Sequence, residues 1–277
     1  MKDLTERVGL IAGDGVLPLE FVRTAKEKNF DVVGIGLTED SSSSLNAVTD
    51  NSIFCPLGKP MKIVEYLKLN EVKEIAFAGK VDKRILFKSN GDLDEHAIKI
   101  FKNAGHLNDV NIMNHVIDFF ESHGLKVISQ LKFLSSLVAG EGSLNEIKIN
   151  TNDISEFGYC YKITRQIAFL DIGQTVVFNN GVVIAVEAME GTDATLYRSY
   201  ELGGEGAIVC KVSRPEQDCR FDIPVVGFDT IEILKKISAS ALVVQAGGTL
   251  ITDWREVLKV SRLAGIKIYG FPDRPIK

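Results

Sequence analysis

Short apolar runs alternate with stretches of helical periodicity in the first half of the chain, and this alternation restricts the fold more than any other feature. Four runs have the length of buried strands: residues 8–12, 30–37, 52–55 and 74–78. Helical patterns separate them at residues 17–28, which Pro18 opens, and at 61–69. Strands separated by helices of this length indicate βαβ units with parallel strands and right-handed crossovers. The first half is therefore predicted to be a parallel sheet covered by helices.

A change of composition follows these units. Residues 94–124 have a helical pattern, 125–128 form a short apolar run, and a Gly-rich stretch at 139–143 leads into the polar residues 145–153. Such a shift is typical of a domain boundary. We place the boundary near residue 132, which gives an N-terminal domain of residues 1–132 and a C-terminal domain of residues 133–277 that includes the connecting helices. The serines at 41–44 are interpreted as a polar loop.

The second half combines helices with a hairpin. Residues 154–169 have a helical pattern, and two apolar runs at 175–178 and 182–186 flank Asn179-Asn180-Gly181. Asn-Gly between apolar runs favours a type I′ turn, since both residues tolerate positive φ. Further strands are predicted at 207–212, 223–226, 241–244 and 266–269, and further helices at 230–237 and 253–263. The second half is therefore predicted to be mixed α/β.

Composition excludes several classes of protein. The 277 residues are 45% hydrophobic and 25% charged, as in ordinary globular proteins, and the formal charge of −5 argues against nucleic acid as a main partner. No apolar run approaches the ~20 residues of a membrane span. The first residues carry both signs of charge, unlike a signal peptide, and the four cysteines form no Cys-x-x-Cys pattern. These features lead us to expect a cytoplasmic protein with reduced thiols.

Three glycine-containing loops follow predicted strands of the first half. They hold Gly13-Asp14-Gly15, Gly58-Lys59 and Gly79-Lys80. Because the carboxyl ends of parallel strands share one edge of a sheet, these loops are predicted to lie along that edge, where ligands bind. Glycines allow close approach of a ligand, and lysines neutralise phosphate, so a diphosphate could be held there. Each loop taken singly could equally be an ordinary turn with a solvated lysine.

A nicotinamide site is an alternative for the first loop. Gly13-x-Gly15 begins a dinucleotide pattern, and Glu39 or Asp40 could bind a ribose hydroxyl. Pro18 stands where the third glycine of that pattern would fall, so the match is incomplete. The four histidines do not predict a zinc site either, because His106 and His115 would project from nearly opposite sides of a helix.

The second half carries a dense set of polar residues. Glu187, Thr192 and Asp193 surround the predicted start of a helix, and either of the last two could simply cap it. Lys211 and Arg214 add cations, and Arg220 and Asp222 add an adjoining cation and carboxylate. Hydrolysis of a diphosphate needs this mixture, with cations or a metal for the phosphoryl oxygens and a carboxylate for metal or water. Structural ion pairs could account for the same run.

Five motifs together resemble the LpxI-type UDP-2,3-diacylglucosamine pyrophosphatases of lipid A biosynthesis. They are Gly9-Leu-Ile-Ala-Gly-x-Gly15, Phe77-Ala-Gly-Lys-Val81, Leu170-Asp-Ile-Gly-Gln174, Glu187-Ala-x-Glu-Gly-Thr-Asp-Ala194 and Arg220-Phe-Asp-x-Pro-x-x-Gly227. The resemblance spans nearly the whole chain. It implies a Rossmann-like N-terminal domain and a distinct C-terminal catalytic domain of mixed α/β structure. The chain departs from the family at Gln245-Ala-Gly, where many relatives carry Glu-Ala-Gly.

The resemblance also implies a reaction. Such enzymes hydrolyse UDP-2,3-diacylglucosamine to 2,3-diacylglucosamine 1-phosphate (lipid X) and UMP with Mg²⁺, for which Mn²⁺ could substitute. Asp222 and Asp193 are the expected catalytic and metal-binding residues. The expected substrate-binding residues are Gly13, Gly58, Lys59, Gly79, Lys80, Gln174, Thr192, Lys211 and Arg220. Binding of an amphiphile implies transient contact with the inner membrane surface, and a homodimer is kept as an expectation.

Two other functions stay open from the sequence. A non-catalytic lipid or nucleotide carrier could use the same two domains. A nicotinamide-dependent enzyme acting on a nucleotide sugar would use Gly13-x-Gly15, but it leaves Arg220-Phe-Asp-x-Pro without a role.

Overall fold

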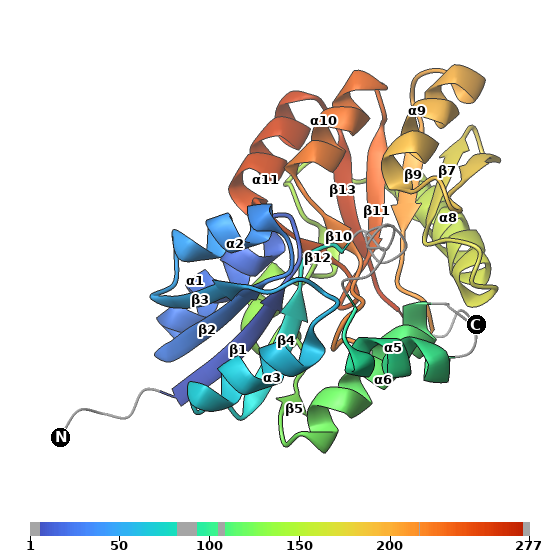
Figure 1. Cartoon of the computed structure of the whole chain (residues 1–277). Coiled ribbons are helices and arrows are strands. Elements are labelled where there is room, and N and C mark those ends of the chain that lie inside the picture. Colours follow the sequence, from blue (N-terminus) through green and yellow to red (C-terminus); the bar gives the residue numbers. More distant parts are fainter. Residues whose placement is uncertain (1–5, 82–92, 105–108, 216, 274–277) are drawn as a thin grey trace. The chain divides into compact units, whose positions relative to one another are not determined.

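The chain divides into two compact units in a computed structural model (Figure 1). The structure describes residues 6–81, 93–104, 109–215 and 217–273. Unit 1 consists of Met1–Ser135 with Cys219–Phe221, and unit 2 of Ser136–Asp218 with Asp222–Lys277. Each unit has its own sheet and its own hydrophobic core.

Unit 1 is built on a five-stranded sheet with the order β3-β2-β1-β4-β5. The strands are β1 (Glu6–Ala12), β2 (Phe30–Gly36), β3 (Asn51–Phe54), β4 (Glu74–Ala78) and β5 (Lys126–Val127). Each neighbouring pair is parallel. This confirms the predicted parallel sheet. The order changes direction between β1 and β4, so the loops after these two strands meet at the switch point where open α/β sheets bind ligands.

Helices cover both faces of this sheet. They are α1 (Leu17–Glu27), α2 (Glu39–Asn46), α3 (Pro60–Leu69), α6 (Asp109–Ser122) and α7 (Leu131–Leu134), whereas α5 (Glu95–Ala104) packs against α3 and α6. Ile11 and Ile75 of the strands pack with Leu67 of α3 on one face. On the other face Phe21 of α1 and Phe133 of α7 have ring centroids 4.7 Å apart. The core therefore forms on both sides of the sheet, as alternation of side chains along buried strands requires.

The serines at 41–44 lie in α2, so their interpretation as a loop was wrong. A capping box starts this helix: the Thr38 hydroxyl accepts a hydrogen bond from the Ser41 N–H (3.0 Å), and the Ser41 hydroxyl accepts one from the Thr38 N–H (3.0 Å). Two orphan N–H groups are thereby satisfied. A Cβ on Gly36 would lie 2.4 Å from the Ser42 backbone, so α2 packs directly against β2.

Unit 2 has a six-stranded mixed sheet with the order β6-β13-β11-β9-β7-β8, and a separate parallel pair β10-β12. The strands are β6 (Gly142–Ser143), β7 (Thr175–Asn179), β8 (Val182–Val186), β9 (Ile208–Lys211), β10 (Val225–Val226), β11 (Ala241–Gln245), β12 (Leu250–Ile251) and β13 (Lys267–Phe271). β9, β11 and β13 are parallel, and β7 is antiparallel to β8 and β9. The predicted hairpin is confirmed, since Asn180 (φ 50°) and Gly181 (φ 75°) both have positive φ.

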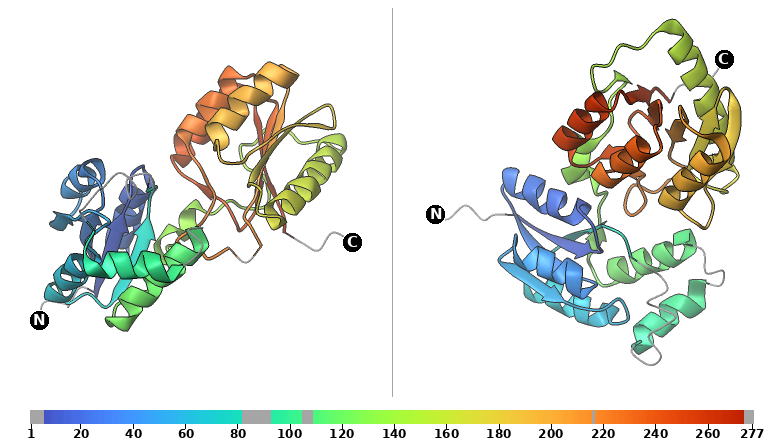
Figure 2. Two further views of the ribbon diagram at one scale, coloured as in Figure 1. Left: turned by 45° about the vertical axis from the view of Figure 1, so that its right-hand side comes forward. Right: turned by 90° about the horizontal axis from the view of Figure 1, so that it is seen from above.

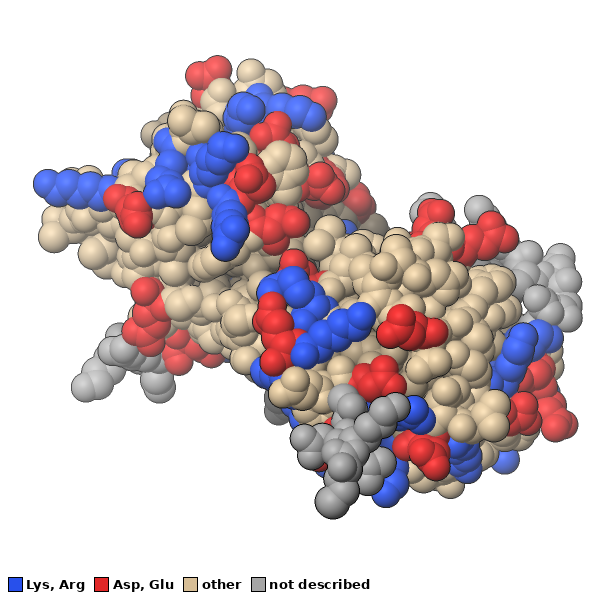
Figure 3. Space-filling view, turned by 90° about the vertical axis from the view of Figure 1, so that its left-hand side faces the viewer, with Lys and Arg blue, Asp and Glu red and all other residues tan. Residues whose placement is uncertain are grey.

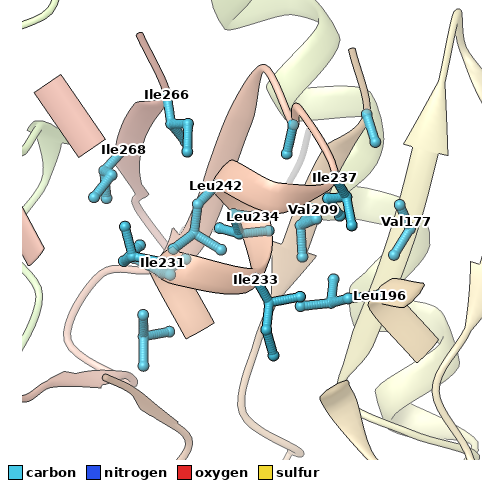
Figure 4. Close-up of a cluster of buried hydrophobic side chains, with 14 of the residues drawn as sticks. Val177, Leu196, Val209, Ile231, Ile233, Leu234, Ile237, Leu242, Ile266 and Ile268 are labelled. Carbon is cyan, nitrogen blue, oxygen red and sulfur yellow. The ribbon is translucent and has the colours of Figure 1, made fainter. Parts of the chain in front are cut away.

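The sheet of unit 2 lies between two helical layers. The helices are α8 (Thr151–Phe169), α9 (Thr192–Gly203), α10 (Phe228–Lys236) and α11 (Trp254–Leu263). Alternate residues of the strands belong to two different cores. Val209 and Leu242 pack with Leu234 of α10 (Figure 4), whereas their neighbours Cys210 and Val243 pack with α8. Figure 2 shows α8 on one side of the sheet and the other three helices opposite.

One short segment from the second half of the sequence belongs to unit 1. The Phe221 side chain packs against the core of that unit. The Ser129 hydroxyl donates to the Cys219 carbonyl (3.1 Å), and the Arg220 guanidinium lies 4.0 Å from the Glu121 carboxylate. The chain thus passes from unit 2 into unit 1 for three residues and returns at Asp222.

Charged side chains of both signs are mixed on the face drawn in Figure 3. Among the helices of the described residues, none combines the length and the apolar composition needed to cross a bilayer.

Candidate functional site

Four neighbouring strands of unit 2 bring their loops to one edge of the sheet. β9 ends at Lys211, β11 ends at Gln245, and β8 ends next to Glu187. β7 runs in the opposite direction and therefore begins at this edge, directly after Gln174. The Gln174 carbonyl accepts a hydrogen bond from the Val212 N–H (3.0 Å). The structure therefore places Gln174 beside the end of β9, next to Lys211.

The segment after β8 is pinned to the segment before β7. The Glu187 N–H donates to the Thr175 carbonyl (2.9 Å). A Cβ on Gly173 would lie only 1.9 Å from the Glu187 carbonyl oxygen, so this position has room for glycine alone. Gly173 of the motif Leu170-Asp-Ile-Gly-Gln174 is thus required because two backbones approach each other closely at this position.

A chain of hydrogen bonds links three of these loops. The Lys211 ammonium donates to the Thr192 hydroxyl (3.0 Å), which donates to the Glu187 carboxylate (2.8 Å). Gly191 is the N-cap of α9, and no side chain caps this helix. The alternative in which Thr192 or Asp193 caps the helix is therefore wrong. The hydroxyl of Thr192 instead holds Lys211 at the start of a helix whose N–H groups favour an anion.

Asp222 lies beside a guanidinium that the candidate set did not include. Arg214 Nη1 is 3.7 Å from Asp222 Oδ2, and Arg214 Nε is 2.9 Å from Asp171 Oδ1. The Asp222 side chain is 35% exposed, so it can reach a ligand from solvent. Asp193 is exposed in the first turn of α9. Sequence reasoning noted Arg214 as a cation, but its contact with Asp171 joins segments far apart in the chain.

The residue before Arg214 is held by Gln245. The N–H and the hydroxyl of Ser213 both donate to the Gln245 side-chain oxygen (2.9 and 2.7 Å). Arg165 donates to the Ser213 carbonyl (2.7 Å), and the Gln245 amide donates to Asp273 (3.2 Å). The departure from the family at position 245 therefore leaves a buried side chain with partners on both of its polar atoms.

The loops after β1 and β4 of unit 1 lie against each other. The Asp14 N–H donates to the Lys80 carbonyl and the Lys80 N–H to the Asp14 carbonyl (both 2.8 Å), while the Gly13 N–H donates to the Ala78 carbonyl (2.9 Å). A Cβ on Gly13 would lie 2.3 Å from the Lys80 carbonyl oxygen, and Gly79 has a φ of 93°. The structure thus brings Gly13, Gly79 and Lys80 together. The N–H groups of Gly13 and Lys80 already bond within the protein.

Gly58 and Lys59 belong to the same edge of unit 1 but follow the outer strand β3. The loop after β2 lies between them and Gly13, and its Thr38 hydroxyl donates to the Asp14 carboxylate. The Gly58 carbonyl accepts a hydrogen bond from the Asp94 N–H (2.9 Å). Arg220 belongs to unit 1 through its segment, whereas Asp222 belongs to unit 2.

In the described part of the chain, the charged groups at the edge of unit 2 form no preformed metal site. Among residues 6–81, 93–104, 109–215 and 217–273, no three His, Cys, Asp or Glu side chains are grouped to hold an ion. Mg²⁺ is normally held by one or two carboxylates together with substrate phosphates and water. The carboxylates of Asp222 and Asp193 fit that kind of binding by their oxygen chemistry. His106, considered above for zinc, lies outside the described residues.

Comparison with known proteins assigns both halves of the chain. Residues 7–137 match the LpxI N-terminal domain and residues 140–269 the LpxI C-terminal domain. The chain belongs to the LpxI family. A similar protein is the UDP-2,3-diacylglucosamine pyrophosphatase LpxI of Caulobacter vibrioides, which is 27% identical over 95% of this chain and 97% of the relative. The LpxI N-terminal domain therefore corresponds to unit 1, and the LpxI C-terminal domain to unit 2.

Two solved structures show a slight similarity to this chain. An ADP complex of N5-carboxyaminoimidazole ribonucleotide synthetase matches with a TM-score of 0.29 and 11% identity over 72% of this chain. The enzyme of the same name from Thermotoga maritima matches with a TM-score of 0.24 and 16% identity over 67% of this chain. The chain spans less than half of each of these proteins, 44% and 42%. Neither likeness carries an argument about fold or function.

Proposed function

We propose that this protein hydrolyses the diphosphate of UDP-2,3-diacylglucosamine, giving UMP and 2,3-diacylglucosamine 1-phosphate in lipid A biosynthesis. Membership of the LpxI family along both units carries the proposal, and the relative from Caulobacter vibrioides bears the name of that activity. The polar edge of unit 2 supports it, because a carboxylate, two cations and an uncapped helix start lie there. This is the mixture that phosphoryl transfer to water requires.

In this mechanism Asp222 accepts a hydrogen bond from the attacking water and orients it toward phosphorus. The water oxygen bonds to phosphorus and its proton is released to solvent, the bridging P–O bond breaks, and the leaving phosphate takes the electron pair. Lys211, held by Thr192, balances the charge on the phosphoryl oxygens. Gln174 and Arg220 contribute further hydrogen bonds to the substrate.

The loops of unit 1 are assigned to substrate binding. Lys59 and Lys80 stand at the carboxyl edge of the sheet, where their ammonium groups would meet a phosphorylated ligand. Gly13, Gly58 and Gly79 shape the backbone of these loops. The start of α1 is not assigned to the anion, because Pro18 has no N–H and the N–H groups of Leu19 and Glu20 donate to the Val16 carbonyl (3.0 and 3.1 Å).

Mg²⁺ is proposed as the metal, with Mn²⁺ as a substitute. Asp222 and Asp193 would hold it together with oxygens of the diphosphate. When bound, the ion would neutralise charge that builds up on the phosphoryl oxygens. A chelator is therefore expected to abolish turnover, and Mg²⁺ to restore it.

The proposal is tested by adding UDP-2,3-diacylglucosamine to the purified protein, with Mg²⁺ or with chelator, and measuring UMP and lipid X. We expect Asp222→Ala to lose most turnover while it still binds substrate. Asp229→Ala is the matched control, because Asp229 is an exposed aspartate in the first turn of α10. Full turnover by Asp222→Ala would contradict the role given to this carboxylate.

A non-catalytic carrier is the second function to be distinguished. Lipid X that co-purifies with the protein, without release of UMP under any metal condition, would favour the carrier.

Transient contact with the inner membrane surface and a cytoplasmic location stay predictions. Exposed apolar side chains support the first: Phe169, Leu170 and Ile172 precede β7, and Met189 follows β8, so both loops lie at the edge that carries Lys211. Flotation with vesicles of phosphatidylethanolamine and phosphatidylglycerol tests the contact, and substitution of Met189 by Ser should weaken it.

A further inference from the structure

Arg214 lies between two carboxylates of different segments. Its Nε is 2.9 Å from Asp171 and its Nη1 is 3.7 Å from Asp222. Each carboxylate therefore pairs by charge with a different nitrogen of one planar guanidinium, and within the described residues Nε makes no hydrogen bond. Arginine spreads its charge over the three nitrogens of a rigid plane, whereas lysine carries it on one flexible ammonium, so arginine can face two carboxylates in a fixed geometry that lysine does not reproduce.

The backbone at Arg214 is fixed from both sides. All three polar groups of Ser213 are bonded, to Gln245 and Arg165. The Arg214 N–H itself donates to the Gln217 side-chain oxygen (2.7 Å). Pro215 follows, and a residue before proline is restricted to extended backbone. The position of the guanidinium is thus set by bonds that do not involve Asp222.

Asp171 is equally fixed although its side chain is 68% exposed. It follows the end of α8 with a φ of 56°, and its N–H donates to the Ala168 carbonyl (3.1 Å). Two residues later, Gly173 is held against the Glu187 carbonyl. An aspartate tolerates this left-handed conformation, and asparagine does so equally well. The carboxylate of Asp171 is therefore presented to Arg214 from a rigid turn.

We propose that Arg214 is the positioning residue for Asp222, and that Asp171 holds the Arg214 guanidinium in place. The inference rests on the proposed function, in which Asp222 orients the attacking water. The guanidinium pairs with Oδ2 of Asp222, which leaves the other oxygen, Oδ1, to face the attacking water or the metal. Asp171 has no contact with the reacting groups in this scheme and acts through Arg214 alone.

The test compares kcat and KM of Arg214→Lys, Asp171→Asn and the double variant. A misplaced catalytic group can cost about 10²-fold, so Arg214→Lys should lower kcat by about that factor with little change in KM. Loss of a partly exposed ion pair costs less, so Asp171→Asn should lower kcat about two- to fivefold. The double variant should equal Arg214→Lys, because the flexible ammonium no longer fixes Asp222 whether or not Asp171 pairs with it.

A matched pair provides the control. Arg262 and Glu146 form an ion pair of 2.7 Å elsewhere in unit 2, and Glu146 also has a left-handed φ, 63°. Arg262→Lys and Glu146→Gln should leave kcat and KM unchanged. Circular dichroism and thermal unfolding establish that each variant is folded, and Asp171→Asn serves as the milder variant if Arg214→Lys is not.

The outcomes distinguish a failure of the proposed function from a failure of the roles given to Arg214 and Asp171. No turnover by the wild-type protein would refute the proposed function, and this inference with it. Normal wild-type turnover with an unchanged kcat for folded Arg214→Lys would refute only the role of Arg214. Effects of Asp171→Asn and Arg214→Lys that multiply in the double variant would refute the role of Asp171.

Discussion

Substitution of Gly173 by alanine tests how tightly the candidate site is built. The added Cβ would lie 1.9 Å from the Glu187 carbonyl oxygen. An ordinary close carbon–oxygen contact is about 3.3 Å, so the two backbones must separate by about 1.4 Å. The backbone at Gly173 does not have positive φ, and the effect would therefore come from the clash and not from conformational strain.

The clash adjoins contacts that shape the site. The Glu187 N–H bonds to the Thr175 carbonyl (2.9 Å), and the Glu187 carboxylate accepts from Thr192. Overpacking of this kind costs about 1–3 kcal/mol of stability. A displacement of about 1 Å at a reacting group costs about 10²-fold in rate, so activity should fall further than stability suggests.

The assay measures thermal unfolding and kcat for Gly173→Ala beside Gly140→Ala. Gly140 is the matched control, since the nearest atom to its added Cβ is 4.0 Å away and its φ is not positive. For Gly173→Ala we expect Tm to fall by about 3–10 °C. For Gly140→Ala both quantities should stay close to the wild type. A folded Gly173→Ala with wild-type kcat and Tm would refute the reasoning about this contact.

Two further predictions concern pH and thiol chemistry. Lys132, and to a smaller extent Lys126, lowers the pKa of Glu74. The ion pairs of Glu74 with these lysines therefore stabilise the fold above the ordinary glutamate pKa, and this stabilisation is lost as the pH falls through the lowered pKa. Glu74→Gln should cost about 0.5–1 kcal/mol at pH 7 in urea unfolding, and the difference should vanish in acid; a constant difference at pH 3 would contradict this. Burial raises the pKa of Cys160 to about 12, and Cys55 and Cys210 are also buried, so iodoacetamide at pH 8 should label the native protein at the exposed Cys219 and the unfolded protein at every cysteine, as mass spectrometry can count. Rapid labelling of native Cys160 would show that its burial is not maintained in solution.

Features that depend on neighbouring residues could be predicted from the sequence. The Asn180-Gly181 turn and the strands of unit 1 follow from local turn chemistry and apolar runs. The helix α2 was missed although its signal is also local. Serine is a poor helix former, and the capping box at Thr38 uses Ser41 where glutamate or glutamine is usual.

Features that depend on the meeting of distant segments could not be predicted. The Asp171–Arg214–Asp222 arrangement needs the end of α8, the loop after β9 and the returning segment at 222 to be in place together. Likewise the paired loops at Asp14 and Lys80 follow from the order of strands, which places β1 beside β4. Motif resemblance named most of these positions, but not which of them touch.

The segment Cys219–Phe221 limits how the two halves of this protein can be recombined. Phe221 completes the core of unit 1 although the rest of its sequence neighbourhood belongs to unit 2. A single cut between residues 135 and 136 would therefore leave the N-terminal fragment without Phe221, which packs against its core. Chimaeras that exchange halves between relatives would have to preserve both partners of this contact, so the two domains are expected to change together in evolution and not as independent modules.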